Sequence, residues 1–155
     1  MKRHGGFSLI ELMITVALIG VLLMIAVPFT GAWSDSAQVR DAEGLLNQGI
    51  ARAKAHALRN RFGIIDDKPA ALLCLGQDKR LSLHEAASAD SPASCSSPSV
   101  WTTQLPKRVA VQSGGADFSC LAFDAKATPT SLSGCSQGLT FALAVGSENV
   151  TISLN

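Results

Sequence analysis

The stretch GGFSLIELMITVALIGVLLMIAVP, from Gly5 to Pro28, is apolar along most of its length, yet it carries one carboxylate, Glu11, near its start. The 23 residues from Leu12 to Ser34 include no charged side chain. A helix needs about 20 apolar residues to cross a bilayer, so this segment is long enough to span one. The position of Glu11 needs its own explanation, because a lone carboxylate in hydrocarbon costs roughly 2.5 kcal/mol or more.

The charges on either side of this apolar run predict its orientation. Lys2, Arg3 and His4 precede the run, and Asp35 follows it. Positive residues stay on the cytoplasmic side of a membrane. We therefore expect residues 35–155 to be exported, and at this length they form one domain of ordinary size.

The four cysteines all lie in the part that is expected to be exported. An even number of cysteines in such a domain favours two disulfides, for which the sequence allows three pairings. Sequential pairing closes the shorter loops, and it joins Cys74 to Cys95 and Cys120 to Cys135. The separations of 21, 25 and 15 residues lack the closely spaced cysteine pair of a zinc site, so no metal is expected.

A second helical stretch is predicted behind the apolar segment. Its apolar residues recur at steps of three and four: Val39, Ala42, Leu46, Ile50, Ala53 and Ala57. This periodicity predicts an amphipathic helix over residues 36–60 whose apolar stripe lies on a sheet. Pro28 is expected to end or kink the preceding stretch, because proline removes a backbone donor and clashes with the previous turn. Gly44 and Gly49 are interpreted as places of close packing or slight bending.

After Arg61 the pattern changes to short segments separated by turn residues. The segments that are interpreted as strands are FGIID (62–66), AALLCLG (70–76), RLSLH (80–84), RVAVQS (108–113), CLAFD (120–124), GLTFALAV (138–145) and NVTISL (149–154). The last two suggest a hairpin with the four-residue turn Gly146–Asn149, and EAASADSPASCSSPS (85–99) suggests a surface loop held by Cys95. A long helix followed by short strands predicts an α+β fold in which the helix packs on an antiparallel sheet.

The rest of the domain shows no pattern typical of an enzyme. No phosphate loop or dinucleotide-binding glycine pattern is present, so no cofactor and no catalytic activity are expected. His56 and His84 are interpreted as surface histidines, because neither has a recognisable nucleophile as a partner. Residues 62–155 contain six basic and eight acidic side chains, and this net charge of −2 argues against nucleic acid as a partner.

The end of the predicted helix carries a basic cluster. Its members are Arg52, Lys54, His56, Arg59 and Arg61. The cluster forms either a patch for a partner or a solvated helix end. The second interpretation is favoured, because cations suit the negative end of the helix dipole.

The N-terminal segment has three interpretations. A secretory signal cut near Thr30-Gly31-Ala32 is disfavoured by the length of the apolar run and by Glu11 inside it. A plain membrane anchor explains the length but not the carboxylate. The third interpretation uses every feature, because KRHGGFSLIELMITVALIGVLLMIAVP (2–28) resembles the N-terminus of the type IV pilins.

This resemblance implies a pilin fold, with a long N-terminal helix that is transmembrane in its first half and amphipathic in its second. The implied parts are a prepilin leader (1–6), a transmembrane and filament-core helix (7–34), and a periplasmic globular domain (35–155) with its helix at 36–60 and its sheet at 62–155. A prepilin peptidase would cut between Gly6 and Phe7 and methylate the new amine of Phe7. Glu11 would then pair with the amine of a neighbouring subunit and set the subunit register. Pairing with its own Phe7 amine is the alternative, since residues four apart share a helical face.

A second stretch narrows the resemblance. GLLNQGIARAKAHALRNR (44–61) resembles the helix end of the GspH/FimT-like group, which includes minor type IV pilins and a minor pseudopilin of type II secretion. A minor pilin that acts in pilus initiation or at the tip is therefore expected, with the pseudopilin as the alternative. A DNA-binding competence pilin is disfavoured, because Lys126 is the only basic residue after Arg108. The expected partners are other pilin subunits, the prepilin peptidase and the inner membrane, in which the chain begins as a single-pass precursor.

Overall fold

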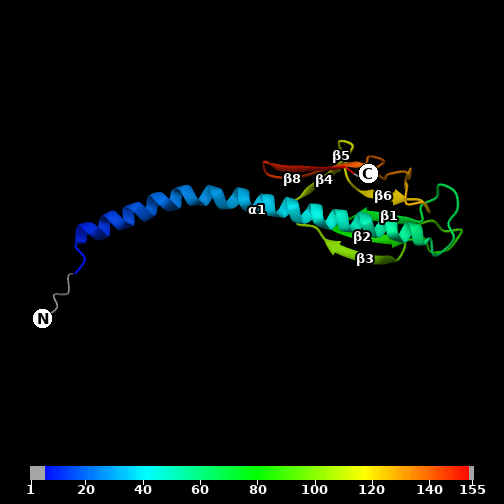
Figure 1. Cartoon of the computed structure of the whole chain (residues 1–155), viewed down its shortest axis with the longest axis horizontal. Coiled ribbons are helices and arrows are strands. Elements are labelled where there is room, and N and C mark those ends of the chain that lie inside the picture. Colours follow the sequence, from blue (N-terminus) through cyan, green and yellow to red (C-terminus); the bar gives the residue numbers. More distant parts are fainter. Residues whose placement is uncertain (1–5, 154–155) are drawn as a thin grey trace.

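The computed structural model describes residues 6–153, and within residues 26–30 it describes the backbone but not the side chains. The described part is an α+β fold with one long helix and nine strands, and the helix packs on antiparallel sheet through its second half only (Figure 1). The helix α1 spans Leu9–Arg59. The strands are β1 (Ala71–Leu75), β2 (Arg80–Glu85), β3 (Ser99–Gln104), β4 (Ala110–Ser113), β5 (Ala116–Asp117), β6 (Cys120–Phe123), β7 (Pro129–Thr130), β8 (Thr140–Val145) and β9 (Glu148–Ser153).

The amphipathic half of α1 is confirmed residue by residue. All six residues of the predicted apolar stripe are buried: Val39, Ala42, Leu46, Ile50, Ala53 and Ala57. They pack into one core with the strand residues. The helix ends at Arg59, where Asn60 takes a left-handed conformation and its backbone N–H bonds to the carbonyl oxygens of His56 and Ala57.

The helix continues through Pro28 instead of ending there. α1 is one element from Leu9 to Arg59, so the possibility that proline ends the first helical stretch is wrong. Figure 1 shows that the extended half of α1 is bowed. A kink at Pro28 itself falls within residues 26–30, whose side chains lie outside the described part, and it stays a prediction.

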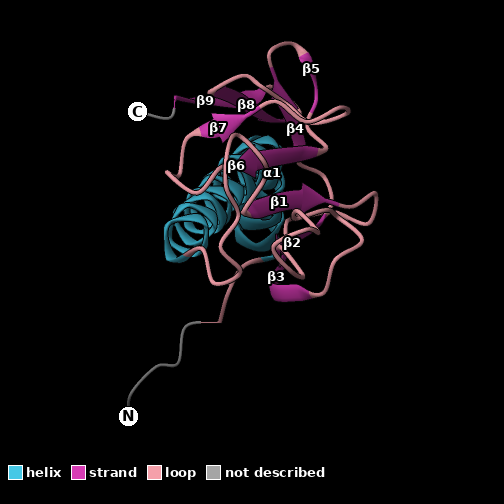
Figure 2. Cartoon of the chain, turned by 90° about the vertical axis from the view of Figure 1, so that its right-hand side faces the viewer, coloured by secondary structure: helices cyan, strands magenta, loops and turns pink. Residues whose placement is uncertain are grey.

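The strands form two antiparallel sheets instead of the single sheet that the sequence suggested. The first sheet has the order β3-β2-β1-β6-β7, and the second has the order β5-β4-β8-β9. Viewed nearly along α1, the strands lie in an arc around one side of the helix (Figure 2). Both sheets bury apolar side chains in the common core: Leu73, Leu81, Leu83, Leu121 and Phe123 from the first, and Val111, Phe141, Leu143 and Val145 from the second.

One predicted strand is absent, and the strands β3, β5 and β7 were not predicted. FGIID (62–66) is not a strand, because Gly63 and Asp66 have φ angles of +66° and +61°, which a regular ladder does not contain. β3 was missed, although its sequence SVWTTQ contains the β-branched and aromatic residues that favour strands. β3 directly follows the serine- and proline-rich segment, so the sequence shows no clear boundary at the start of the strand.

The C-terminal hairpin is confirmed, but its turn is shorter than expected. Val145 pairs with Glu148, so the turn has two central residues, Gly146 and Ser147. Gly146 has a φ of +58°. Ser147 is not among the residues with positive φ, and a two-residue turn with positive φ at its first position alone is the type II′ turn, whose twist suits a hairpin.

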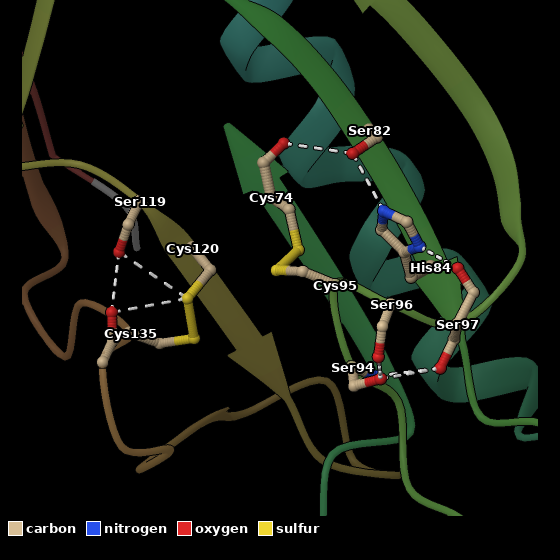
Figure 3. The surroundings of a disulfide bond; sticks show 11 residues. Cys74, Ser82, His84, Ser94, Cys95, Ser96, Ser97, Ser119, Cys120 and Cys135 are labelled. Carbon is tan, nitrogen blue, oxygen red and sulfur yellow. Dashed lines mark hydrogen bonds between the residues drawn. A yellow bond between two sulfur atoms is a disulfide. The ribbon is translucent and has the colours of Figure 1, made fainter. Parts of the chain in front are cut away.

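The two disulfides lie on the face of the first sheet that is turned away from α1. They follow the sequential pairing that the loop lengths favour, with Cys74 joined to Cys95 and Cys120 joined to Cys135. Cys74 and Cys120 are opposite each other on β1 and β6, so both bridges start from one place on the sheet (Figure 3). Each bridge ties a loop over this outer face, where Leu72 and Ala122 are buried in a small second apolar cluster. Closing loops of this length contributes about 3 kcal/mol each in the chain-entropy account.

We expect Gly49→Ala to destabilise the domain and Gly44→Ala to stabilise it. A Cβ at residue 49 would lie 2.9 Å from Leu81 Cδ2 and 3.2 Å from Leu73 Cδ1, so α1 reaches the sheet closely only because this side chain is absent. Overpacking of this kind costs about 1–3 kcal/mol, which outweighs the roughly 0.5–1 kcal/mol that alanine gains over glycine in a helix. Gly44 is exposed, with no atom within 4 Å of an added Cβ, so alanine there gains roughly 0.5–1 kcal/mol.

Denaturant unfolding of the full chain in detergent measures both changes. The two alanine variants are matched controls, because they add the same methyl group to the same helix. Equal free energies of unfolding for the two variants would contradict the packing role of Gly49.

Candidate functional site

The Gly6–Phe7 peptide bond lies in the short non-helical segment before α1. Phe7 is 81% exposed, and no atom lies within 4 Å of the place that a Cβ of residue 6 would occupy. Peptidases cut exposed, non-helical segments more readily than packed ones. The chain therefore leaves this bond open to a peptidase.

Ser8 begins the helix as its N-cap. Its backbone is extended, and its hydroxyl oxygen accepts a hydrogen bond from the Glu11 backbone N–H at 3.3 Å. This is one half of a capping box, the pattern Ser-x-x-Glu at a helix start. The role of Ser8 was not predicted, although the pattern is visible in FSLIE. Glu11 also places a negative charge in the first turn, where it complements the helix dipole.

The structure corrects the relation between Phe7 and Glu11. The two residues do not share a helical face, because Phe7 precedes the N-cap and α1 begins at Leu9. Among residues 6–153, the Glu11 carboxylate has no hydrogen bond or ion pair, and the side chain is exposed. Within the described residues, the helix therefore presents a carboxylate without a partner near its tip.

The extended half of α1 exposes apolar side chains on every side. The large ones between residues 7 and 25 are Phe7, Leu9, Ile10, Leu12, Met13, Ile14, Val16, Leu18, Ile19, Val21, Leu22, Leu23, Met24 and Ile25, each at least 55% exposed. Apolar surface of this extent is rare on soluble monomers and marks an interaction site. Among the residues with described side chains, 6–25 and 31–153, no helix is both long and apolar enough to cross a membrane.

The helix meets the globular part at Asp35. Residues 31–34 are exposed, whereas the side chain of Asp35 is largely buried and its Oδ1 lies 2.8 Å from Arg108 Nη1. This contact is an ion pair without the alignment of a hydrogen bond. The turn of the C-terminal hairpin packs on the same carboxylate, since a Cβ at Gly146 would lie 2.8 Å from Asp35 Oδ2. Asp35 thus connects α1 to two loops, those that hold Arg108 and Gly146. We call this point, where the helix enters the globular part, the neck.

Comparison with known families bears on the same N-terminal segment. Residues 1–27 match the prokaryotic N-terminal methylation motif. The match includes Gly6, Phe7 and Glu11, and it supports a type IV pilin-like protein, either a pilin or a pseudopilin. Such a motif fits a membrane-anchored precursor that a prepilin peptidase processes and that assembles with other pilin subunits. No curated protein and no solved structure gives a significant match.

The two histidines behind the methylation motif are not the surface side chains that the sequence suggested. His84 is buried, and its Nδ1 donates to the Ser97 carbonyl oxygen at 2.6 Å while its Nε2 lies 2.9 Å from Ser82 Oγ (Figure 3). His56 is half-buried, and its Nδ1 lies 2.5 Å from Glu85 Oε1. Each histidine joins segments that are distant in the sequence, which is why the sequence pattern did not indicate these contacts.

The basic cluster at the end of α1 is largely engaged within the domain. The guanidinium of Arg52 lies over the Trp101 ring at 5.2 Å, and that of Arg61 lies over the Phe62 ring at 5.6 Å. His56 binds Glu85 and Lys54 is also engaged, so at least four of the five predicted members have partners and the cluster is more than a solvated helix end. Within residues 6–153, no group of three His, Cys, Asp or Glu side chains is arranged to hold a metal ion.

Proposed function

We propose that this chain is a minor pilin, a structural subunit that helps to initiate a type IV pilus or forms part of its tip. The observation that carries the proposal is the exposed apolar half of α1, with Glu11 at its tip and the accessible Gly6–Phe7 bond just before it. A helix with apolar side chains on every side is stable only when other apolar matter surrounds it. In the precursor this is lipid, and in the filament it is the α1 helices of other subunits.

The minor role rests on two features. The helix end resembles the GspH/FimT-like group, which contains minor subunits. The globular part also has two disulfides, whereas a single bridge near the C-terminus is common in major pilins.

The spacing of charges along α1 suits a single-pass precursor whose globular domain lies in the periplasm. Glu11 and Asp35 are 24 residues apart, which is roughly 36 Å along a helix. The hydrocarbon core of a bilayer is about 30 Å thick, so Glu11 reaches one of its surfaces and Asp35 reaches the other. Trp33, which is 78% exposed beside the neck, is of the residue type that prefers the membrane–water interface. In the precursor Glu11 therefore lies near the cytoplasmic surface and costs little.

Glu11 acquires its role when the subunit leaves the membrane. Cleavage creates a positive amine on Phe7, and in a filament core both charges are surrounded by apolar side chains. Phe7 lies outside the helix, so its amine is free to reach a neighbouring subunit. A charge pair between neighbours costs less than two lone charges, and it sets the axial register of helices that are otherwise uniformly apolar.

Deletion of the gene separates a pilus subunit from the rival pseudopilin. We expect the deletion to remove most surface pili and twitching motility, while exported hydrolases reach the medium at normal levels. Because a pilus needs initiation before the shaft can grow, the effect should be large even for a minor subunit. Wild-type complementation is the control. Intact pili with hydrolases held in the periplasm would assign the chain to type II secretion instead.

A further inference from the structure

Three of the four edge strands carry features that prevent pairing with another chain. β5 and β7 are only two residues long. β3 has a register shift against β2 that leaves Val100 without a partner, and Pro98 and Pro106 lie just outside its ends. Short strands, bulges and prolines are the usual means by which proteins protect exposed sheet edges.

The fourth edge strand, β9, has none of these features. Its six residues pair with β8 in unbroken register, and they include no proline and no lysine. Glu148, at the start of the strand, is its only charged residue. Among the described strands β9 pairs with β8 alone, so no strand covers its other edge, although β9 also packs against α1.

The two-residue turn determines which backbone groups of β9 point to the open edge. Val145 and Glu148 close the turn as a hydrogen-bonded pair, and every second residue of β9 from Glu148 then bonds to β8. The remaining residues direct their N–H and C=O groups outward: Asn149, Thr151 and Ser153. These outward groups have no hydrogen bond to any other part of residues 6–153.

Two apolar side chains of β9 are also incompletely buried. Val150 and Ile152 pack on the core but are only half-buried. Their cross-strand partners on β8, Leu143 and Phe141, are fully buried. A further strand beside β9 would bury more of these two side chains and would pair the outward backbone groups.

We propose that β9 binds an extended strand of a different filament subunit, which adds to the second sheet at this edge. The inference rests on the proposed function. An alternating row of main-chain N–H and C=O groups matches the main chain of another strand, and such strand addition is a common mode of recognition. The outward side chains, Asn149, Thr151 and Ser153, are short and uncharged, so they do not repel an incoming strand.

The direction of β9 argues against a second copy of this chain as the partner. β8 and β9 run along α1 (Figure 1). Antiparallel pairing of two β9 strands would therefore point their α1 helices in opposite directions. A filament needs all α1 helices in one direction, and a different subunit can supply a strand from elsewhere in its fold.

Photo-crosslinking in intact, piliated cells tests the partner. A photoreactive residue replaces Thr151 in the full chain, and a matched control replaces Thr102, an exposed threonine on the protected edge strand β3. We expect crosslinks from position 151 to another pilin subunit, identified by mass spectrometry, and little product from position 102. Equal yields from both positions, or crosslinks only to a second copy of this chain, would overturn the inference.

A pair of substitutions at Thr151 tests the backbone contact. Thr151→Pro removes one outward N–H and keeps the hydrogen bonds between β9 and β8. Proline is tolerated in edge strands at positions whose N–H points away from the sheet. Thr151→Ala keeps the N–H. Since one hydrogen bond is lost, we expect the proline variant to enter filaments about three- to tenfold less than the alanine variant. Equal incorporation of the two variants would overturn the strand inference alone. The proposed function would also be overturned if the wild-type chain were not cut at Gly6–Phe7 and were absent from sheared filaments.

Discussion

A Gly6→Leu variant is expected to keep its leader of residues 1–6 and to be absent from filaments. The prepilin peptidase must bring its catalytic groups to the Gly6–Phe7 bond, and a large side chain at residue 6 blocks that approach. The fold of the chain itself does not suffer, because no atom lies within 4 Å of an added Cβ and the residue precedes the N-cap Ser8. We expect the cleaved fraction to fall from nearly complete to nearly zero.

Intact mass and N-terminal sequencing measure this outcome. The wild-type protein should begin at a methylated Phe7. The matched control is Gly20→Leu, the same substitution at a glycine of the exposed helix that also has no atom within 4 Å of an added Cβ, and it should be cut normally. Normal cleavage of the Gly6→Leu protein would contradict the assignment of the site, and a wild-type N-terminus near Trp33 would indicate a secretory signal.

The Glu11→Ala variant is expected to insert into the membrane as well as the wild type, or better, and to enter filaments at least tenfold less. Insertion survives because the substitution leaves the apolar run from Leu12 to Ser34 unchanged and only removes a charge near the membrane surface. The N-cap also survives, because Ser8 Oγ bonds to the backbone N–H of residue 11 and not to its side chain. Incorporation falls because the amine of the neighbouring subunit loses its partner, and breaking a buried pair from one side costs about 3–5 kcal/mol.

Quantitative blotting of sheared filaments and of membrane fractions measures both parts of this prediction. Thr15→Ala is the matched control: it lies one turn further along α1, is exposed, and its Oγ1 donates to the Leu12 carbonyl oxygen at 2.9 Å. That variant removes a polar group without removing a charge, and it should assemble normally. Wild-type levels of the Glu11→Ala protein in filaments would exclude a role for Glu11 in subunit register.

Local patterns in the sequence predict α1 well. The burial of Val39, Leu46 and Ile50 follows directly from their spacing, because a helix turns by a constant angle per residue and places them on one stripe. The disulfide pairing also follows from short-range considerations, since loop length favours the sequential order. The predicted processing site is local too: a glycine, an exposed bond and a carboxylate lie within a few residues of one another.

The errors arise where two distant segments meet. His84 looks like a surface residue in the sequence because the segment after β2 must fold back over the strand before the Ser97 carbonyl oxygen can reach its ring. Gly44 and Gly49 look alike in the sequence. Only the approach of Leu81 and Leu73 makes the second one necessary.

Local sequence patterns predict the long helix, its change from apolar on all sides to amphipathic, the methylation motif and a strand-rich domain. These features depend on the periodicity and charge of neighbouring residues, so they can be inferred from short stretches of the sequence. The tertiary structure was needed to show that the strands form two sheets, which strands lie at the edges, and that β9 is the unprotected edge among the described strands. Strand order depends on which distant segments pair. The pairing is set when the inner faces of all strands are buried against α1 together. No single stretch of sequence therefore specifies the order of the strands.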